Sequence, residues 1–134
     1  YRDYTIRQLC QEMHDLYVSF NVKDLQKAMF RQESLPAVVM NPQDANQEYI
    51  RGNVELVRIR DAEGRIAAEG ALPYPPGVLC VVPGEVWGGA VQRYFLALEE
   101  GINMLPGFSP ELQGVYSEKD ADGIKRLYGY VLNV

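Results

Sequence analysis

The chain has 134 residues, of which 47% are hydrophobic and 23% are charged. This composition is typical of one globular domain with a buried core. Its formal net charge of −5 argues against nucleic acid as a partner, because little basic surface is available to neutralise phosphates. An acidic surface suits a cationic substrate or simply keeps the chain soluble.

No apolar run approaches the ~20 residues that a membrane span requires, and the first residues lack a signal-peptide layout. We therefore expect no membrane partner and a cytoplasmic location. Tyr1 opens the chain in place of a methionine, which predicts a fragment of a longer protein. Cys10 and Cys80 lie far apart among apolar neighbours, so buried, reduced thiols are expected, with a disulfide as the alternative.

The first half of the chain predicts helices. Thr5-x-x-Gln8 is a capping-box pattern, and a helical apolar stripe follows it until Asn21. The stripe consists of Ile6, Leu9, Cys10, Met13, Leu16, Tyr17 and Phe20. A second, shorter helix is expected over residues 23–31, with Leu25, Ala28 and Met29 facing inward. Residues 37–40 are a candidate buried strand after Leu35-Pro36. Asn41-Pro42 indicates a third helix near residues 43–50, ended by Gly52.

The second half predicts strands around one long helix. Residues 54–60 and 64–70 are expected to form a hairpin, and residues 78–82 a fully buried strand. Residues 85–101 predict a helix with Gly88 and Gly89 in its first turn. Its apolar side consists of Trp87, Val91, Tyr94, Phe95, Leu98 and Ile102. Residues 112–116 and 124–132 predict a last strand pair around an Asp-Gly turn.

Together these elements predict an α+β fold in a single compact domain over residues 1–134. N-terminal helices, β-hairpins in a small mixed or antiparallel sheet and one long amphipathic helix are its expected parts. The sequence has no internal repeat and no linker.

The most restrained segment of the chain is 72–85, LPYPPGVLCVVPGE. Its prolines fix φ and remove backbone donors, and its glycines adopt conformations that other residues avoid. Within it, Glu85 is either a functional carboxylate or an acid that favours the first turn of the following helix, an effect of about 0.3–1 kcal/mol. Tyr74 either forms the wall of a channel or packs its ring on the prolines.

Residues for acid–base, nucleophilic or metal chemistry are scarce. His14 is the only histidine, and its place beside the apolar stripe indicates a packed or half-exposed structural residue. A metal site needs more ligands than His14 and two distant cysteines supply, and a Cys10–His14 nucleophile pair lacks an orienting third group. We therefore predict no catalytic and no metal-binding residue.

Long ordered blocks of the sequence resemble a known family. LPYPPG, the apolar run, PGE, EVWGGAVQRYFLALEEGINMLPGF and ELQGVY are similar to the C-terminal domain of the bacterial ornithine, lysine and arginine decarboxylases, the ornithine members above all. The resemblance extends over nearly the whole chain, from TIRQLCQEMHDLY to the last hairpin. It implies a parent carboxy-lyase that depends on pyridoxal phosphate and converts ornithine, or another basic amino acid, to an amine such as putrescine and carbon dioxide in polyamine biosynthesis.

The resemblance also implies a place for this domain in that enzyme. The domain would cap the catalytic pyridoxal-phosphate domain, shape the substrate channel and support contacts in a homo-oligomer. Tyr74, Pro75, Pro76, Gly77 and Glu85 would form the edge of the channel as scaffold, not as acid–base catalysts.

The family's cofactor lysine follows a Ser-x-His motif on another domain, and no lysine follows His14 in that pattern. We therefore expect this fragment to bind no cofactor and to be inactive alone. Two alternatives are a stand-alone protein-interaction module and a regulatory module that binds a small anion through Arg58, Arg60 and Arg65. Some relatives in the family bind a phosphorylated guanosine with arginines, but no matching motif is present here. A large exposed apolar patch would favour a domain of a larger enzyme over a free module.

Overall fold

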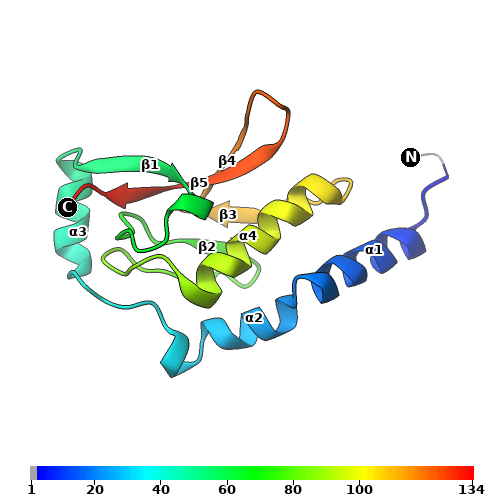
Figure 1. Cartoon of the computed structure of the whole chain (residues 1–134), viewed down its shortest axis with the longest axis horizontal. Coiled ribbons are helices and arrows are strands. Elements are labelled where there is room, and N and C mark those ends of the chain that lie inside the picture. Colours follow the sequence, from blue (N-terminus) through cyan, green and yellow to red (C-terminus); the bar gives the residue numbers. More distant parts are fainter. Residues whose placement is uncertain (1–2) are drawn as a thin grey trace.

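A computed structural model describes residues 3–134 of the chain. Its elements alternate between helices and short strands, which confirms the predicted α+β class (Figure 1). In chain order they are α1 (Ile6–Ser19), α2 (Val22–Met29), the 3-10 turn η1 (Gln32–Ser34), α3 (Pro42–Ile50), β1 (Val54–Arg58), the 3-10 turn η2 (Ile59–Asp61), β2 (Leu72–Tyr74), α4 (Gly89–Met104), β3 (Glu111–Gln113), β4 (Tyr116–Lys119) and β5 (Lys125–Leu132).

Both sheets are antiparallel. The larger sheet has the order β1-β5-β4 and the smaller one pairs β2 with β3. β5 is the central strand: Val57 on β1 lies opposite Gly129, and Ser117 on β4 lies opposite Leu127. Beyond the end of β4, the loop residue Ala67 continues that edge of β5 through a bridge to Val131.

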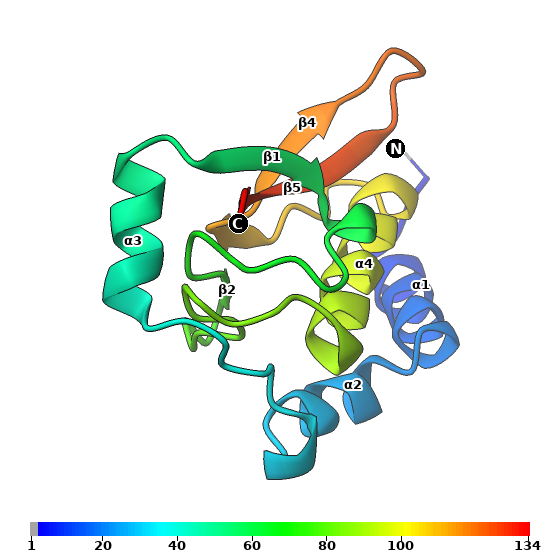
Figure 2. The same cartoon turned by 60° about the vertical axis from the view of Figure 1, so that its left-hand side comes forward.

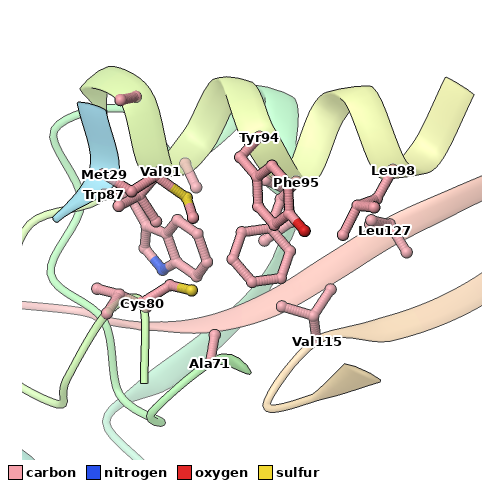
Figure 3. Packing of buried hydrophobic residues seen from close by; sticks show 14 of the residues in the cluster. Met29, Ala71, Cys80, Trp87, Val91, Tyr94, Phe95, Leu98, Val115 and Leu127 are labelled. Atoms are coloured by element: carbon pink, nitrogen blue, oxygen red, sulfur yellow. The ribbon is translucent and has the colours of Figure 1, made fainter. Parts of the chain in front are cut away.

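The main core lies between α4 and the sheets, with α2 on the outer side of α4 (Figures 1 and 2). Trp87 and Phe95 are its largest fully buried side chains, and their rings meet edge to face with centroids 5.5 Å apart (Figure 3). This geometry is favourable for aromatic pairs. A smaller cluster beneath α3 contains Ala45, Ala68 and Leu132.

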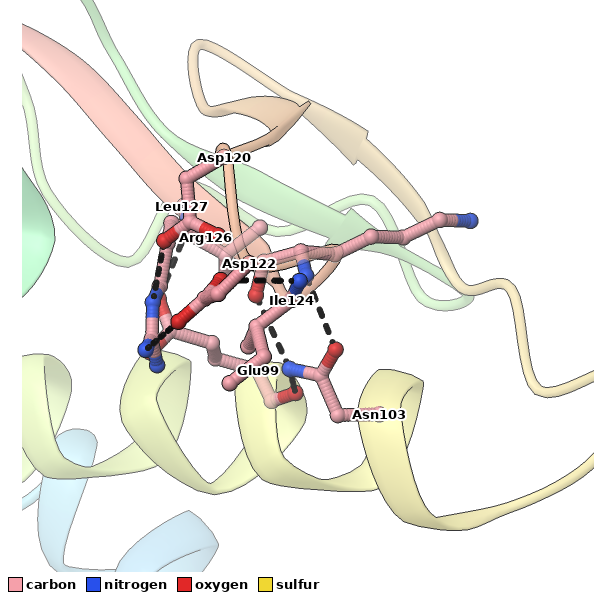
Figure 4. Close-up of polar contacts among 8 residues, drawn as sticks. Glu99, Asn103, Asp120, Asp122, Ile124, Arg126 and Leu127 are labelled. Atoms are coloured by element: carbon pink, nitrogen blue, oxygen red, sulfur yellow. Dashed lines mark hydrogen bonds and ion pairs between the residues drawn. The ribbon is translucent and has the colours of Figure 1, made fainter.

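Glu99 and Asn103 on α4 fix the β4–β5 hairpin to the helix (Figure 4). The buried Glu99 carboxylate accepts a hydrogen bond from the Leu127 backbone N–H at 2.8 Å. The Asn103 amide bonds both backbone groups of Lys125, at 2.8 and 2.9 Å. Arg126 lies beside Glu99 at 3.9 Å and pairs with Asp120 at 3.1 Å. These contacts supply the partners that a buried carboxylate requires.

The predicted starts of α1 and α3 are confirmed by their caps. The Thr5 hydroxyl accepts from the Gln8 N–H, and the Gln8 side chain accepts from the Thr5 N–H, which is the predicted capping box. Asn41 caps α3 by accepting from the Gln43 N–H at 2.8 Å. α2 starts one residue before the predicted range and ends two residues before its end.

The expected burial of the α1 stripe is wrong. Leu16 is the one α1 residue that is buried, while Ile6 and Cys10 are exposed. The Cys10 thiol, which was expected to be buried, is therefore exposed. Cys80 is buried as predicted, and both thiols are free, without a disulfide between them. An apolar stripe shows which side of a helix favours an apolar contact. Within residues 3–134, only Leu16 of this stripe is buried by such a contact.

Two expected strands are absent from the structure. Residues 37–40 form a single bridge from Val38 to Glu85, and Val38 and Val39 are 70% and 56% exposed. Residues 78–82 contribute one bridge, from Val81 to Ala71, and Val78 and Leu79 are half exposed. Short apolar runs predict apolar contact, but they do not specify whether that contact lies inside this domain.

The expected hairpin between residues 54–60 and 64–70 is also wrong. β1 pairs with β5, more than seventy residues away, because the chain turns through η2 and buries Ile59 directly after β1. The last pair is confirmed in part: β4 and β5 form the hairpin, but residues 111–113 pair with β2. α4 starts at Gly89 and not at residue 85, because Val86 and Trp87 donate backbone hydrogen bonds to Ala37 and Arg65.

Candidate functional site

The segment 72–85 first doubles back on itself. β2 pairs with β3, and the chain then passes through cis peptide bonds at Tyr74-Pro75 and Pro75-Pro76. The Gly77 N–H donates to the Pro73 carbonyl at 2.9 Å, and φ at Gly77 is +79°. A Cβ at Gly77 would lie 2.7 Å from the Tyr74 ring, so the ring packs on this glycine. The other edge of the ring faces solvent.

The second half of the segment is fixed by backbone hydrogen bonds. Cys80 donates to the Ala71 carbonyl at 2.9 Å, and Ala71 donates to Val81 at 3.0 Å. The Glu85 carboxylate accepts from the Val82 N–H at 2.8 Å and so closes the turn between them. The interpretation of Glu85 as a first-turn helix residue is wrong, because α4 begins at Gly89.

Gly84 joins this segment to the connection between α2 and α3. Its carbonyl accepts from the Val39 and Met40 N–H groups, each at 3.1 Å. With φ at +91°, a Cβ at Gly84 would lie 2.2 Å from the Met40 carbonyl oxygen. Only glycine permits this close approach. The approach keeps residues 38–40 in contact with segment 72–85.

Apolar side chains are exposed on the two segments that Gly84 joins. We call this set the proline face: Phe30, Leu35, Val38, Val39, Tyr74, Val78 and Leu79, which are between 44% and 70% exposed. Phe30 and Val78 line one shallow pocket of about 130 Å³ together with Pro76, Cys80 and Tyr94. Isolated exposed apolar residues are ordinary, whereas the residues of the proline face lie on two segments that hydrogen bonds join.

The polar groups in the floor of that pocket are uncharged at neutral pH. Burial raises the pKa of the Cys80 thiol to about 11. Burial also raises the pKa of Tyr94, whose hydroxyl accepts a 3.4 Å hydrogen bond from the Gln26 amide. Both groups therefore stay protonated, so this pocket suits an apolar partner better than an ion.

The side chains of this chain do not fit pyridoxal phosphate. A cofactor lysine requires a pocket with an acidic partner for the pyridine nitrogen, whereas all four lysines are exposed. Lys119 and Lys125 line a cleft of about 330 Å³ with Ser109 and Ser117, and no carboxylate lines it. Within residues 3–134, no three His, Cys, Asp or Glu side chains are grouped to hold a metal ion, and His14 is exposed.

The three arginines proposed as an anion site have different surroundings. Arg65 donates to Glu55 and Asn133, both at 3.2 Å. Arg58 is half-buried on β1, and Arg60 lines a cleft between α2 and α4. Arg65 is thus engaged by other side chains, while Arg60 is the one member of the set that lines this cleft.

The family model for the Orn/Lys/Arg decarboxylase C-terminal domain matches residues 23–133. The chain belongs to this family. Over 132 residues it is 90% identical to the constitutive ornithine decarboxylase of Escherichia coli (strain K12), covering 98% of this chain and 19% of that protein. It is 70% identical to the ornithine decarboxylase of Haemophilus influenzae (strain ATCC 51907 / DSM 11121 / KW20 / Rd), covering 98% and 18%.

The structural comparison agrees with the sequence comparison. The constitutive lysine decarboxylase of E. coli superposes with a TM-score of 0.81 at 32% identity, covering 98% of this chain and 18% of that one. The chain thus spans about a fifth of the length of the curated relatives it matches. No helix in residues 3–134 has both the length and the apolar content to cross a bilayer.

Sequence reasoning found one half of the proline face and missed the other. The proline and glycine content identifies residues 72–85. On the other half, the sequence predicts that Phe30 lies near the end of a helix, that Leu35 lies in the break after it, and that Val38 and Val39 lie in a buried strand. The available signal was the Leu-Pro break followed by four apolar residues in a row, without the polar alternation that a half-buried strand shows.

Proposed function

We propose that this chain is the C-terminal domain of a pyridoxal-phosphate-dependent ornithine decarboxylase and that it docks through the proline face on the remainder of that enzyme. The observation that supports this most directly is the exposed apolar group on a domain whose relatives are five times longer. Complete burial of one large apolar side chain is worth about 1.5–3 kcal/mol. Burial of the exposed parts of the seven side chains of the proline face would therefore stabilise contact with the rest of the enzyme.

Ornithine as the substrate is favoured by the order of the identities. The chain is 90% and 74% identical to the constitutive and inducible ornithine decarboxylases of E. coli, but 37% identical to the inducible lysine decarboxylase of the same strain. The cofactor would be held by residues outside this chain, since the four lysines are exposed and the cleft that Lys119 and Lys125 line has no carboxylate from residues 3–134 to serve the pyridine nitrogen.

We assign the edge of the substrate channel to Tyr74, Pro75, Pro76, Gly77 and Glu85. Tyr74 offers an exposed ring edge, and the two prolines are exposed beside it. Glu85 acts indirectly, because its carboxylate is engaged with the Val82 N–H and maintains the shape of the turn. We propose that these groups act as scaffold that shapes the surface, and that they do not act as acid–base catalysts.

Substitution of the proline face in the intact enzyme tests this proposal. Val38→Asp places a charge on the docking surface, where it must lose its hydration when the surfaces meet. We expect kcat/KM for release of carbon dioxide from L-ornithine to fall about tenfold or more. Ile50→Asp is the matched control, because Ile50 is 68% exposed on α3, outside the proline face.

Equal activity of the Val38→Asp and Ile50→Asp enzymes would contradict docking through this face. Absence of carbon dioxide release from L-ornithine by the unsubstituted enzyme would contradict the substrate. Ornithine turnover by residues 1–134 alone would contradict the division of labour between this domain and the rest of the enzyme.

A further inference from the structure

A second cleft, of about 580 Å³, lies between α2, α4 and η2. Its lining shares no residue with the pocket of the proline face. Apolar walls come from Leu25 and Ala28 on α2 and from Leu96 and Ala97 on α4. The volume lies in the range of small-molecule sites, which are mostly apolar with a few polar groups that fix orientation. α2 and α4 run side by side in both views (Figures 1 and 2).

Charged side chains occur at defined positions along this cleft. Arg93 and Glu100 lie on the same face of α4, seven residues apart, which is about 10 Å along a helix axis. η2 lies beside the first turns of α4, because the Gln92 amide donates to the carbonyls of Ile59 and Arg60 at 2.8 and 3.3 Å. Arg60 therefore joins Arg93 at one end, and Glu100 marks the other.

These charges are not neutralised by one another. Asp24 completes the set from α2, and none of the four side chains forms an ion pair with any residue of the described range 3–134. Two arginines favour a carboxylate, which guanidinium groups bind with paired hydrogen bonds. The carboxylates favour an ammonium group, and the apolar walls between them favour methylene groups.

We propose that the α2–α4 cleft binds an unbranched amino acid that carries a terminal ammonium group. Its carboxylate would lie at Arg60 and Arg93, its ammonium at Glu100 and Asp24, and its methylene chain along Leu96 and Ala97. Ornithine and lysine belong to this chemical class. That the cleft serves as a second substrate site of the enzyme rests on the proposed function. That the cleft binds unbranched amino acids with a terminal ammonium group rests on its lining alone.

The test uses 5-aminovalerate, which has a carboxylate and an ammonium at the ends of an unbranched chain. It lacks the α-amino group of an amino acid, so decarboxylation does not consume it. Calorimetric titration of the intact protein that contains this chain should give saturable binding. Arg93→Gln and Glu100→Gln should each weaken that binding about tenfold or more, the loss expected for one charge-assisted contact.

Matched controls separate this site from general charge effects. Arg31→Gln and Glu118→Gln make the same changes at exposed positions outside the cleft and should leave binding unchanged. Valerate and pentylamine each carry one of the two charges, so each should bind about tenfold more weakly than 5-aminovalerate.

Three results would overturn the proposal. The first is the absence of saturable binding. The second is binding by the Arg93→Gln and Glu100→Gln proteins that is as tight as binding by the unsubstituted protein. The third is a change of assembly state in those variants when the unsubstituted protein does not bind 5-aminovalerate. The last result would identify the cleft as a contact with another protein segment. Ornithine turnover is measured in a separate experiment. Absence of 5-aminovalerate binding would therefore not contradict the proposed function, and absence of ornithine turnover would not contradict the binding site.

Discussion

Gly84 and Gly52 have similar backbone conformations in different surroundings. Both lie in the left-handed region, with φ at +91° and +81°. A Cβ at Gly84 would approach the Met40 carbonyl oxygen to 2.2 Å, whereas a Cβ at Gly52 would meet nothing within 4 Å. The pair therefore separates the cost of the backbone conformation from the cost of a steric clash.

We expect Gly84→Ala to destabilise the chain far more than Gly52→Ala. A left-handed alanine costs roughly 1 kcal/mol or somewhat more, and this is the whole expected effect at Gly52. At Gly84 the alanine must also displace residues 38–40, so we expect a loss of about 3 kcal/mol or more in the free energy of unfolding. Urea denaturation of both variants checks this, and equal midpoints would show that residues 38–40 move aside without cost.

At the scale of elements, the β4–β5 hairpin depends on α4 for its position. The Glu99 carboxylate is 3% exposed and accepts from the Leu127 N–H. Tertiary contact of this kind is needed because a two-stranded hairpin is marginally stable by itself. Glu99 therefore connects the longest helix to the central strand of the sheet.

Glu99→Ala should lower the free energy of unfolding by about 1–3 kcal/mol, because it leaves a buried N–H without an acceptor. Glu118→Ala, at an exposed position on β4 of the same hairpin, should change it by less than about 0.5 kcal/mol. Thermal unfolding followed by circular dichroism measures both. Similar melting temperatures for the two variants would mean that the Leu127 N–H finds another partner.

The starts of α1 and α3 were predictable because their signals are local, whereas the start of α4 was not. Thr5 with Gln8, and Asn41 with Pro42, act within one turn of the helix they start. The strand pairing was not predictable, since alternation in residues 54–58 indicates a strand but does not identify its partner. That partner, β5, begins at residue 125, and the nearer candidate at residues 64–70 contributes a bridge at Ala67 to the same strand.

For the whole molecule, α1 is a long helix of which little is buried. Only Leu16 is buried, and it packs near Gly101 on α4. The family model begins at residue 23, after α1 has ended. Figure 1 shows α1 continuing the line of α2 along one side of the molecule, and α3 at the opposite end. The sequence predicted the apolar stripe of α1, but within residues 3–134 only Leu16 of that stripe is buried.

We expect α1 to open without the rest of the chain unfolding. Regions with few buried apolar contacts exchange their amide hydrogens through low-energy local openings. Deuterium exchange of residues 1–134 followed by mass spectrometry should therefore label peptides from α1 well before those from α4, which buries nine residues. Equal protection of the two helices would show that α1 belongs to the same cooperative unit.

The central position of β5 constrains how the chain folds during translation. β1, β4 and the loop at Ala67 all bind to a strand that the ribosome makes after each of them. Until β5 has been synthesised, the nascent chain lacks the strand that covers part of the apolar side of α4 and that pairs with β1. Such intermediates are what chaperones bind, so a premature stop in β5 would send the product to proteolysis, however well the preceding helices had formed.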